Sequence, residues 1–285
     1  ASSLAVVVLG DESGYEANEN QKMKLAAIEG MWHTEKAPAS LTLFGLPDEK
    51  HHKTKYAVEI PYVLGLIATS STTEQVQGIA ELIEEGKSKI KEGMIAYQAL
   101  SDLQANENNT LAKQTFEAKQ QYLGYGLLLK KYTDDVAHAT TQQINQAAND
   151  LAPHVAPLFW SFRIMVGCGL SMIALFVTGF VLLLKRRAHT NKWFLRAAVL
   201  ALPLPWIAAE LGWVIAEYGR QPWVVQGVLP TFMGTSSIDL SQILSSLAGF
   251  VLFYSILAVV EVYLMVKYIR KGPEGLNLIV EGDTA

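Results

Sequence analysis

The stretch FWSFRIMVGCGLSMIALFVTGFVLLL, residues 159–184, is apolar over 26 positions apart from one charged residue, Arg163, near its start. A helix that crosses the hydrocarbon core of a bilayer needs about 20 predominantly apolar residues. This stretch therefore predicts a membrane-spanning helix, and it makes the protein an integral membrane protein.

Two more segments of similar character follow, at 197–217 and 243–266, so the sequence predicts three spans. Basic residues set their orientation, because short cytoplasmic loops carry an excess of Lys and Arg. One basic cluster, KRRAHTNKWFLR at 185–196, joins the first two spans, and another, KYIRK at 267–271, follows the third. If the spans alternate in direction, both clusters are cytoplasmic, and the 218–241 loop and the chain before the first span lie outside.

The region before the first span has a different composition. Of residues 11–156, 20 are Asp or Glu, 13 are Lys and none is Arg, whereas every Arg of the chain lies after position 160. This contrast predicts a water-exposed acidic domain at 11–156, membrane helices within 157–271 and a cytoplasmic tail at 272–285. The opening ASSLAVVVLG, residues 1–10, is too short to span and is a poor signal peptide. We expect it to be the end of a membrane helix that begins before this sequence.

Helical spacing of apolar residues recurs through the acidic domain. It is present around 21–32, 74–104, 110–131 and 140–151, and a Pro-containing loop with three histidines is expected at 33–55. The predicted fold is therefore an all-α membrane protein, a transmembrane helix bundle with a large, mostly helical extracytoplasmic loop domain.

Histidine and cysteine patterns argue against two kinds of metal site. His51 and His52 lie among lysines, without the converging carboxylates or histidines that a ligand set normally needs, so a solvated loop is the favoured interpretation. The single cysteine, Cys168, lies inside the first span, and the chain has no CxxC or CxxCH sequence. Covalent haem attachment and a cysteine-rich metal site are therefore excluded for this chain.

Charged residues within the predicted spans are costly and usually face a cavity, a partner or a cofactor; here they are Arg163, Glu210, Glu217 and Glu261. Glu217 precedes Arg220 by one helical turn. The carboxylate can point inward while the guanidinium neutralises it or binds an anionic group such as a haem propionate. The alternative is a simple interfacial salt bridge within an aromatic belt.

Met165 and Trp213 extend the haem hypothesis. A Met thioether is a soft axial ligand that haem iron accepts, although a Met in a membrane helix is more often a packing residue. Gly212 and Gly219 leave space beside a flat ring, on which Trp213 can pack. These residues are compatible with a haem protein, and the packing alternative stays open from the pattern alone.

Several motifs in order resemble one family. ALPLPWIAAELGWVIAEYGRQPWVVQGVLPT at 201–231, VVLGDESGYEANENQKMKLAAIEGMW at 7–32 and FRIMVGCG at 162–169 are similar to subunit I of the cytochrome bd-type quinol oxidases, which are bacterial terminal oxidases. LTLFGLPD, IPYVLGLIAT, LGYGLLLKKYT and VAPLFWSFRIMV match as well, so the resemblance runs from end to end.

The resemblance implies residue roles. Met165 matches the axial iron ligand of the low-spin haem b, and Arg163 the arginine beside that haem. Glu217 matches the carboxylate that ligates a high-spin haem iron, with Arg220 next to it. In the loop, Lys24 and Glu29 match the pair implicated in quinol binding and oxidation. Trp213 is expected to pack on a haem ring.

The resemblance also implies cofactors and partners: a low-spin haem b, a high-spin haem b, a haem d, membrane quinol as substrate, oxygen, subunit II, membrane lipid and no nucleic acid. A small accessory subunit is a further partner that the family leaves open. The location would be the bacterial cytoplasmic (inner) membrane, with 11–156 on the periplasmic side. The complete subunit would have nine spans, and the histidine ligands would lie in the first six, so this chain by itself is expected to be inactive.

Two other classes remain open from the residues. One is a membrane-anchored sensor without enzymatic activity, and the other is a proton-coupled transporter with Glu210, Glu217 and Glu261 as a relay. The motifs do not determine the quinone type, whether the distal haem is d or b, or which high-spin haem Glu217 ligates.

Overall fold

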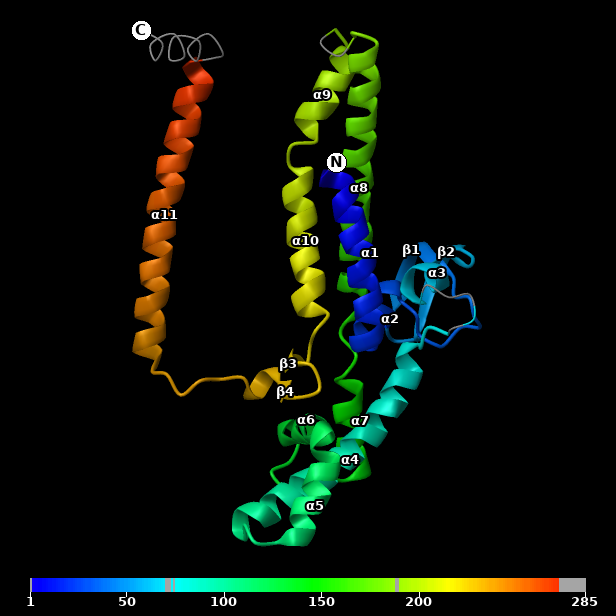
Figure 1. Cartoon of the computed structure of the whole chain (residues 1–285), viewed down its shortest axis with the longest axis vertical. Coiled ribbons are helices and arrows are strands. Elements are labelled where there is room, and N and C mark those ends of the chain that lie inside the picture. Colours follow the sequence, from blue (N-terminus) through cyan, green and yellow to red (C-terminus); the bar gives the residue numbers. More distant parts are fainter. Residues whose placement is uncertain (1, 70–72, 74, 188–189, 272–285) are drawn as a thin grey trace. The chain divides into compact units, whose positions relative to one another are not determined.

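The computed structural model describes residues 2–69, 73, 75–187 and 190–271, in two units that meet between Gly234 and Thr235 (Figure 1). The predicted tail at 272–285 lies outside the described residues. The long apolar helices are α8 Val155–Leu184, α9 Lys192–Leu200 and α10 Leu204–Tyr218 in the first unit and α11 Leu240–Lys271 in the second. Among the described residues, three stretches can cross a membrane by length and composition, with α9 and α10 together forming one of them, and the prediction of three spans is confirmed.

The second span is interrupted between its two helices. Residues 201–203 form a turn, Pro203 is the N-cap of α10, and Pro205 stands in the first turn of that helix. Proline lacks the N–H that would continue a helical hydrogen-bond ladder, so the interruption follows from the sequence. Helices α8 and α10 pack against each other and lie side by side in Figure 1. In the second unit α11 is one helix, and all its side chains are exposed.

Most of the acidic domain is helical, as predicted. Its helices are α1 Ser2–Asn20, α2 Lys22–Glu29, α3 Val63–Thr69, α4 Ile79–Ala105, α5 Thr110–Lys119, α6 Leu123–Leu127 and α7 Thr141–Asn149, with 3-10 turns η1 Gln120–Tyr122 and η2 Leu128–Lys131. Helix α1 continues through Gly10 without a break, so the sequence boundary at that residue is not a boundary of secondary structure.

The prediction of a loop throughout 33–55 was wrong. Strand β1 Leu41–Asp48 pairs antiparallel with β2 Lys53–Ile60. The β-branched and aromatic residues of these two segments suit strands, and this signal outweighs the nearby prolines. A short second hairpin, β3 Trp223–Val225 with β4 Leu229–Pro230, follows α10 and leads into the 3-10 turn η3 Thr231–Met233.

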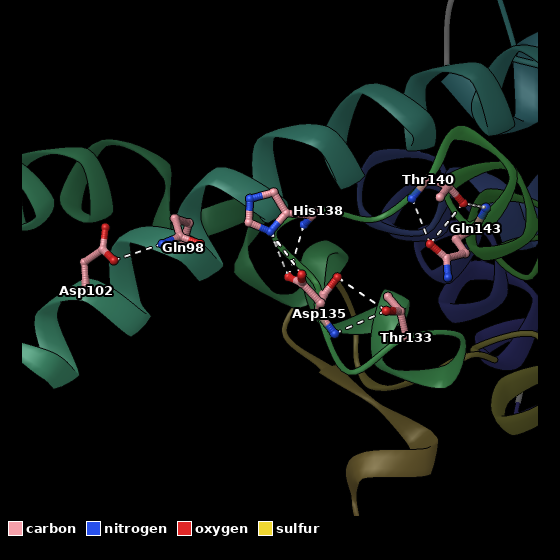
Figure 2. Close-up of polar contacts among 7 residues, drawn as sticks. All are labelled: Gln98, Asp102, Thr133, Asp135, His138, Thr140 and Gln143. Carbon is pink, nitrogen blue, oxygen red and sulfur yellow. Dashed lines mark hydrogen bonds and ion pairs between the residues drawn. The ribbon is translucent and has the colours of Figure 1, made fainter.

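A capping box sets the start of α7 (Figure 2). The backbone N–H of Thr140 donates to Gln143 Oε1 at 2.8 Å, and the backbone N–H of Gln143 donates to Thr140 Oγ1 at 3.4 Å. These bonds satisfy two donors that a helix start otherwise leaves free. The helix then buries Ile144 and Ala147 in a core that includes Ile90 of α4.

The segment after α10 is part of the acidic domain's core. Trp223 is 3% exposed, and its ring lies 5.1 Å from that of Tyr125 in an edge-to-face arrangement. Since the chain leaving α10 packs into the acidic domain, the 218–234 segment and that domain lie at the same end of α10. The basic residues likewise predict that the two segments lie on one side of the membrane.

Candidate functional site

Helix α2 carries both loop residues of the candidate site, Lys24 and Glu29, and packs against α8. Its Ala26 and Ala27 are fully buried in a cluster with Leu158 of α8. Small side chains let the two helices approach closely. The packing of α2 therefore brings charged groups of the acidic domain to the ends of the membrane helices.

Glu29 and Arg163 form a buried ion pair. Arg163 Nη2 donates to Glu29 Oε2 at 3.1 Å, and the side chain of Arg163 is 10% exposed and that of Glu29 4%. Arg163 Nη1 donates to the carbonyl oxygens of Ile28 at 2.8 Å and Phe159 at 3.0 Å. Arg163 Nη2 also donates to the carbonyl oxygen of Thr42. One guanidinium group therefore joins α2, α8 and β1.

The environment of Glu29 changes its proton affinity. Burial raises the pKa of Glu29 to about 7, and the charge and hydrogen bond of Arg163 oppose the rise. A carboxyl group that titrates near neutral pH can both take up and release a proton during turnover. Glu29 is therefore chemically suited to general-base work.

Arg163 has one further donor. Its Nε–H group is buried and has no hydrogen-bond partner among the described residues. Leaving a buried donor unsatisfied costs about 1–3 kcal/mol, and an acidic group of a bound cofactor would supply the acceptor. Met165 lies two residues after Arg163 on α8, and its sulfur is close to α10. A Cβ atom added at Gly212 of α10 would lie only 3.3 Å from Met165 Sδ. A thioether and an unsatisfied guanidinium donor fit an iron porphyrin with acidic side chains.

Glu217 and Arg220 form a second pair at the end of α10. Arg220 Nη2 donates to Glu217 Oε1 at 3.0 Å, and the side chain of Arg220 is 36% exposed and that of Glu217 48%. Exposed pairs of this kind contribute about 0–1 kcal/mol, so stability alone does not explain the two charges. Trp213, one turn earlier, is 64% exposed and presents its ring for packing.

Lys24 lies beside this second pair. The aliphatic part of the Lys24 side chain packs on Gly219, where an added Cβ atom would lie 2.9 Å from Lys24 Cγ. Lys24 Nζ donates a hydrogen bond to Gln21 Oε1 at 3.1 Å. Partial burial lowers the pKa of Lys24, the positive charge of Arg220 lowers it further, and Glu217 has the opposite effect. The three charged groups therefore share one electrostatic environment.

The structure does not bring Lys24 and Glu29 into one pocket. Five positions along a helix correspond to a rotation of about 140°. Lys24 lines a pocket of about 290 Å³ together with Lys89 and Tyr125. Glu29 lines a different pocket of about 280 Å³, which adjoins the β1–β2 hairpin.

Sequence reasoning missed two kinds of contact. Phe159 lies under the Arg163 guanidinium, with 3.4 Å between the guanidinium carbon and the ring centroid. The spacing of four residues on one helix was a signal for this contact. Lys89 and Tyr125 join the pocket of Lys24 through tertiary packing, and no local sequence pattern indicates it.

The histidine pair has local partners. His51 Nδ1 lies 2.8 Å from Asp48 Oδ2, and the His52 ring stacks on Trp32 with 5.5 Å between centroids. Among the described residues, no group of three His, Cys, Asp or Glu side chains is arranged to hold a metal ion.

The membrane-length helices and the folded acidic domain that packs on α8 define a class: membrane proteins with a folded polar domain next to their spans. The sequence model described as cytochrome bd terminal oxidase subunit I matches residues 1–273. The chain belongs to the cytochrome bd terminal oxidase subunit I family.

Individual relatives agree with this assignment. The chain is 38% identical over 274 residues to cytochrome bd-II ubiquinol oxidase subunit 1 of Escherichia coli (strain K12), covering 96% of this chain and 53% of the relative. It is 28% identical over 277 residues to cytochrome bd ubiquinol oxidase subunit 1 of Bacillus subtilis (strain 168), covering 97% and 47%. The solved bd oxidase from Geobacillus thermodenitrificans is similar with a TM-score of 0.54 and 25% identity, covering 95% and 47%. The chain spans about half the length of these relatives.

Proposed function

We propose that the chain is part of a quinol:oxygen oxidoreductase of the bacterial cytoplasmic membrane, which oxidises quinol, reduces oxygen to water and generates a proton motive force. The relatives' names as ubiquinol oxidases support this function. The observation that carries it is the Glu29–Arg163 pair, because it couples a buried carboxyl of the acidic domain to the helix that bears Met165.

The chain's own residues fit haem binding. Met165 would hold the iron of a low-spin haem b, and Arg163 Nε–H would donate to an acidic group of that haem. Glu217 is the proposed ligand of a high-spin haem iron, with Arg220 balancing its charge and Trp213 packing on the ring. Bound haems (the low-spin b, the high-spin b and d) supply one-electron carriers and the oxygen-reducing centre.

The loop residues serve the substrate. Glu29 accepts a proton from a quinol hydroxyl, for which a pKa near neutral is suited. Lys24 donates a hydrogen bond that binds the quinol, and its position beside Arg220 and Glu217 ties that binding to the second charged pair. Since the two side chains line different pockets, proton transfer and binding are separable contributions.

The proposed surroundings follow from the family and the orientation of the spans. Residues 11–156 lie on the periplasmic side, protons from quinol leave there, and protons for water formation enter from the cytoplasm. Proposed partners are membrane quinol, oxygen, lipid and subunit II, with a small accessory subunit as a further option.

The test is a reduced-minus-oxidised optical spectrum of membranes that contain the full-length subunit in its complex, with quinol-driven oxygen uptake measured on the same sample. We expect haem b and d bands in the wild type and loss of the low-spin band in Met165→Leu. Met172→Leu, on the same helix, is the matched control and should keep the band. A wild type without haem would favour the sensor, and substrate flux without oxygen uptake would favour the transporter.

A further inference from the structure

A polar pocket leads from Glu29 toward the surface of the acidic domain. Its volume is about 280 Å³, and since a water molecule occupies about 30 Å³ of liquid, it has room for several waters. Glu29 is one of the buried residues that line it, at 4% exposure. Its walls include Ser40, Thr42 and Thr54, which are all half-buried.

Four other residues that line the same pocket are exposed and titratable. They are His33, Glu35, His52 and Glu59. Exposure of the lining residues therefore increases from Glu29 through three half-buried hydroxyl residues to the exposed acidic and imidazole residues. Such an order of groups suits proton transfer through hydrogen-bonded water.

The walls of the pocket are held by hydrogen bonds. Thr54 Oγ1 donates to the carbonyl oxygen of Gly30 at 3.1 Å and accepts from Trp32 Nε1 at 3.2 Å. These bonds connect β2 to the end of α2. Arg163 Nη2 donates both to Glu29 Oε2 and to the carbonyl oxygen of Thr42, so one guanidinium group holds two residues that line the pocket.

We propose that this pocket is the exit route for the proton that Glu29 takes from quinol, and this rests on the proposed function. Oxidation of one quinol releases two protons and two electrons. For each proton, the quinol O–H bond breaks, the Glu29 carboxylate gains the proton, and one electron leaves the quinol for a bound haem, which would be its one-electron acceptor. The carboxyl group then gives its proton to water in the pocket, which restores the carboxylate for the next transfer.

The pocket can be blocked without touching Glu29. Ser40→Leu and Thr42→Leu each place an apolar side chain on the wall, whereas Ser40→Ala removes the hydroxyl group without adding bulk. Ser88→Leu, on the exposed face of α4, is the control for adding a leucine to the acidic domain. Each variant is made in the full-length subunit and purified with its complex.

Two electron donors separate proton release from electron transfer. Oxygen uptake is measured first with quinol and then with a phenylenediamine dye that donates single electrons. We expect Ser40→Leu and Thr42→Leu to lower quinol-driven oxygen uptake several-fold and to raise its solvent deuterium isotope effect. Dye-driven oxygen uptake should stay at the wild-type rate in both variants. Ser40→Ala should lower quinol-driven oxygen uptake much less, and Ser88→Leu should take up oxygen at the wild-type rate.

Two results would overturn the proposed route. One is a rate of quinol-driven oxygen uptake in Ser40→Leu and Thr42→Leu that equals the rate in Ser88→Leu. The other is an equal loss with both donors, which would place the defect in electron transfer or folding. Failure of the proposed function looks different, because the wild-type complex itself would then not oxidise quinol.

Discussion

The carboxylate of Glu29 lies 3.1 Å from the guanidinium of Arg163, although 134 residues separate them in sequence. Both side chains are buried, and Arg163 makes its other bonds to backbone carbonyl groups. A charge removed from water needs such partners on every side. The pair therefore fixes where α2 docks on α8, and it places a proton-accepting group next to the helix that carries Met165.

Removing one partner of this ion pair should destabilise the folded protein more than removing both. Arg163→Leu leaves the Glu29 carboxylate buried without a partner, which costs about 3–5 kcal/mol for buried pairs in general. The double variant Arg163→Leu with Glu29→Gln should recover part of that stability. Thermal unfolding of the purified complex measures it, and two additive single effects would contradict direct coupling.

Quinol oxidation should depend on pH through Glu29. The group accepts a proton only when ionised, and its pKa is about 7, so kcat/KM should rise as pH increases through about 7 and then level off. Glu29→Gln should lower the rate by about 10²–10⁴-fold and remove this limb. Glu107→Gln, far from α2 in sequence and exposed, should keep the wild-type profile.

The same carboxyl should make stability depend on pH. Its folded pKa of about 7 exceeds its usual 4.5, so the folded state keeps a proton that the unfolded state has lost. This contribution to the free energy of unfolding is fully present below pH 4.5 and disappears as pH rises through about 7. Thermal unfolding across this range should show a smaller decline in Glu29→Gln.

Substitutions of Lys24 and of Glu29 should change different kinetic constants of quinol oxidation. Lys24→Met removes a donor used in binding, so KM for quinol should rise several-fold with a small change in kcat. Glu29→Gln should act mainly on kcat. Lys113→Met, an exposed lysine on α5, controls for loss of one positive charge. Identical effects of the Lys24 and Glu29 variants on both constants would argue against separate roles.

Gly212 should leave the space that the Met165 sulfur needs to reach a haem iron. A methyl group there would lie 3.3 Å from Met165 Sδ, whereas a Cβ at Gly169 of α8 meets nothing within 4 Å. Both Gly→Ala changes gain helix propensity, about 1 kcal/mol each. We expect Gly212→Ala to weaken or shift the low-spin haem band and Gly169→Ala to leave it intact. Equal spectra for the two variants would show that Met165 tolerates the crowding.

Local sequence patterns predicted much of the fold. Apolar length predicted three spans, and helical spacing predicted α2, α4, α5 and α7, because both signals act over a few turns of chain. The hairpin at 41–60 was missed because its strand signal is short and lies between prolines and charged residues. The interruption of the second span at 201–203 follows from Pro203 and Pro205 but was not predicted.

By itself, the sequence determined which residues can carry the chemistry: a thioether and a guanidinium two positions apart, and a carboxyl and a guanidinium one helical turn apart. Only the tertiary structure decided their partners. It paired Glu29 with Arg163, placed Lys24 beside Glu217 and Arg220, and directed Lys24 and Glu29 into different pockets. The reason is physical: a residue's type is local, whereas its burial, pKa and neighbours depend on which distant segments pack against it.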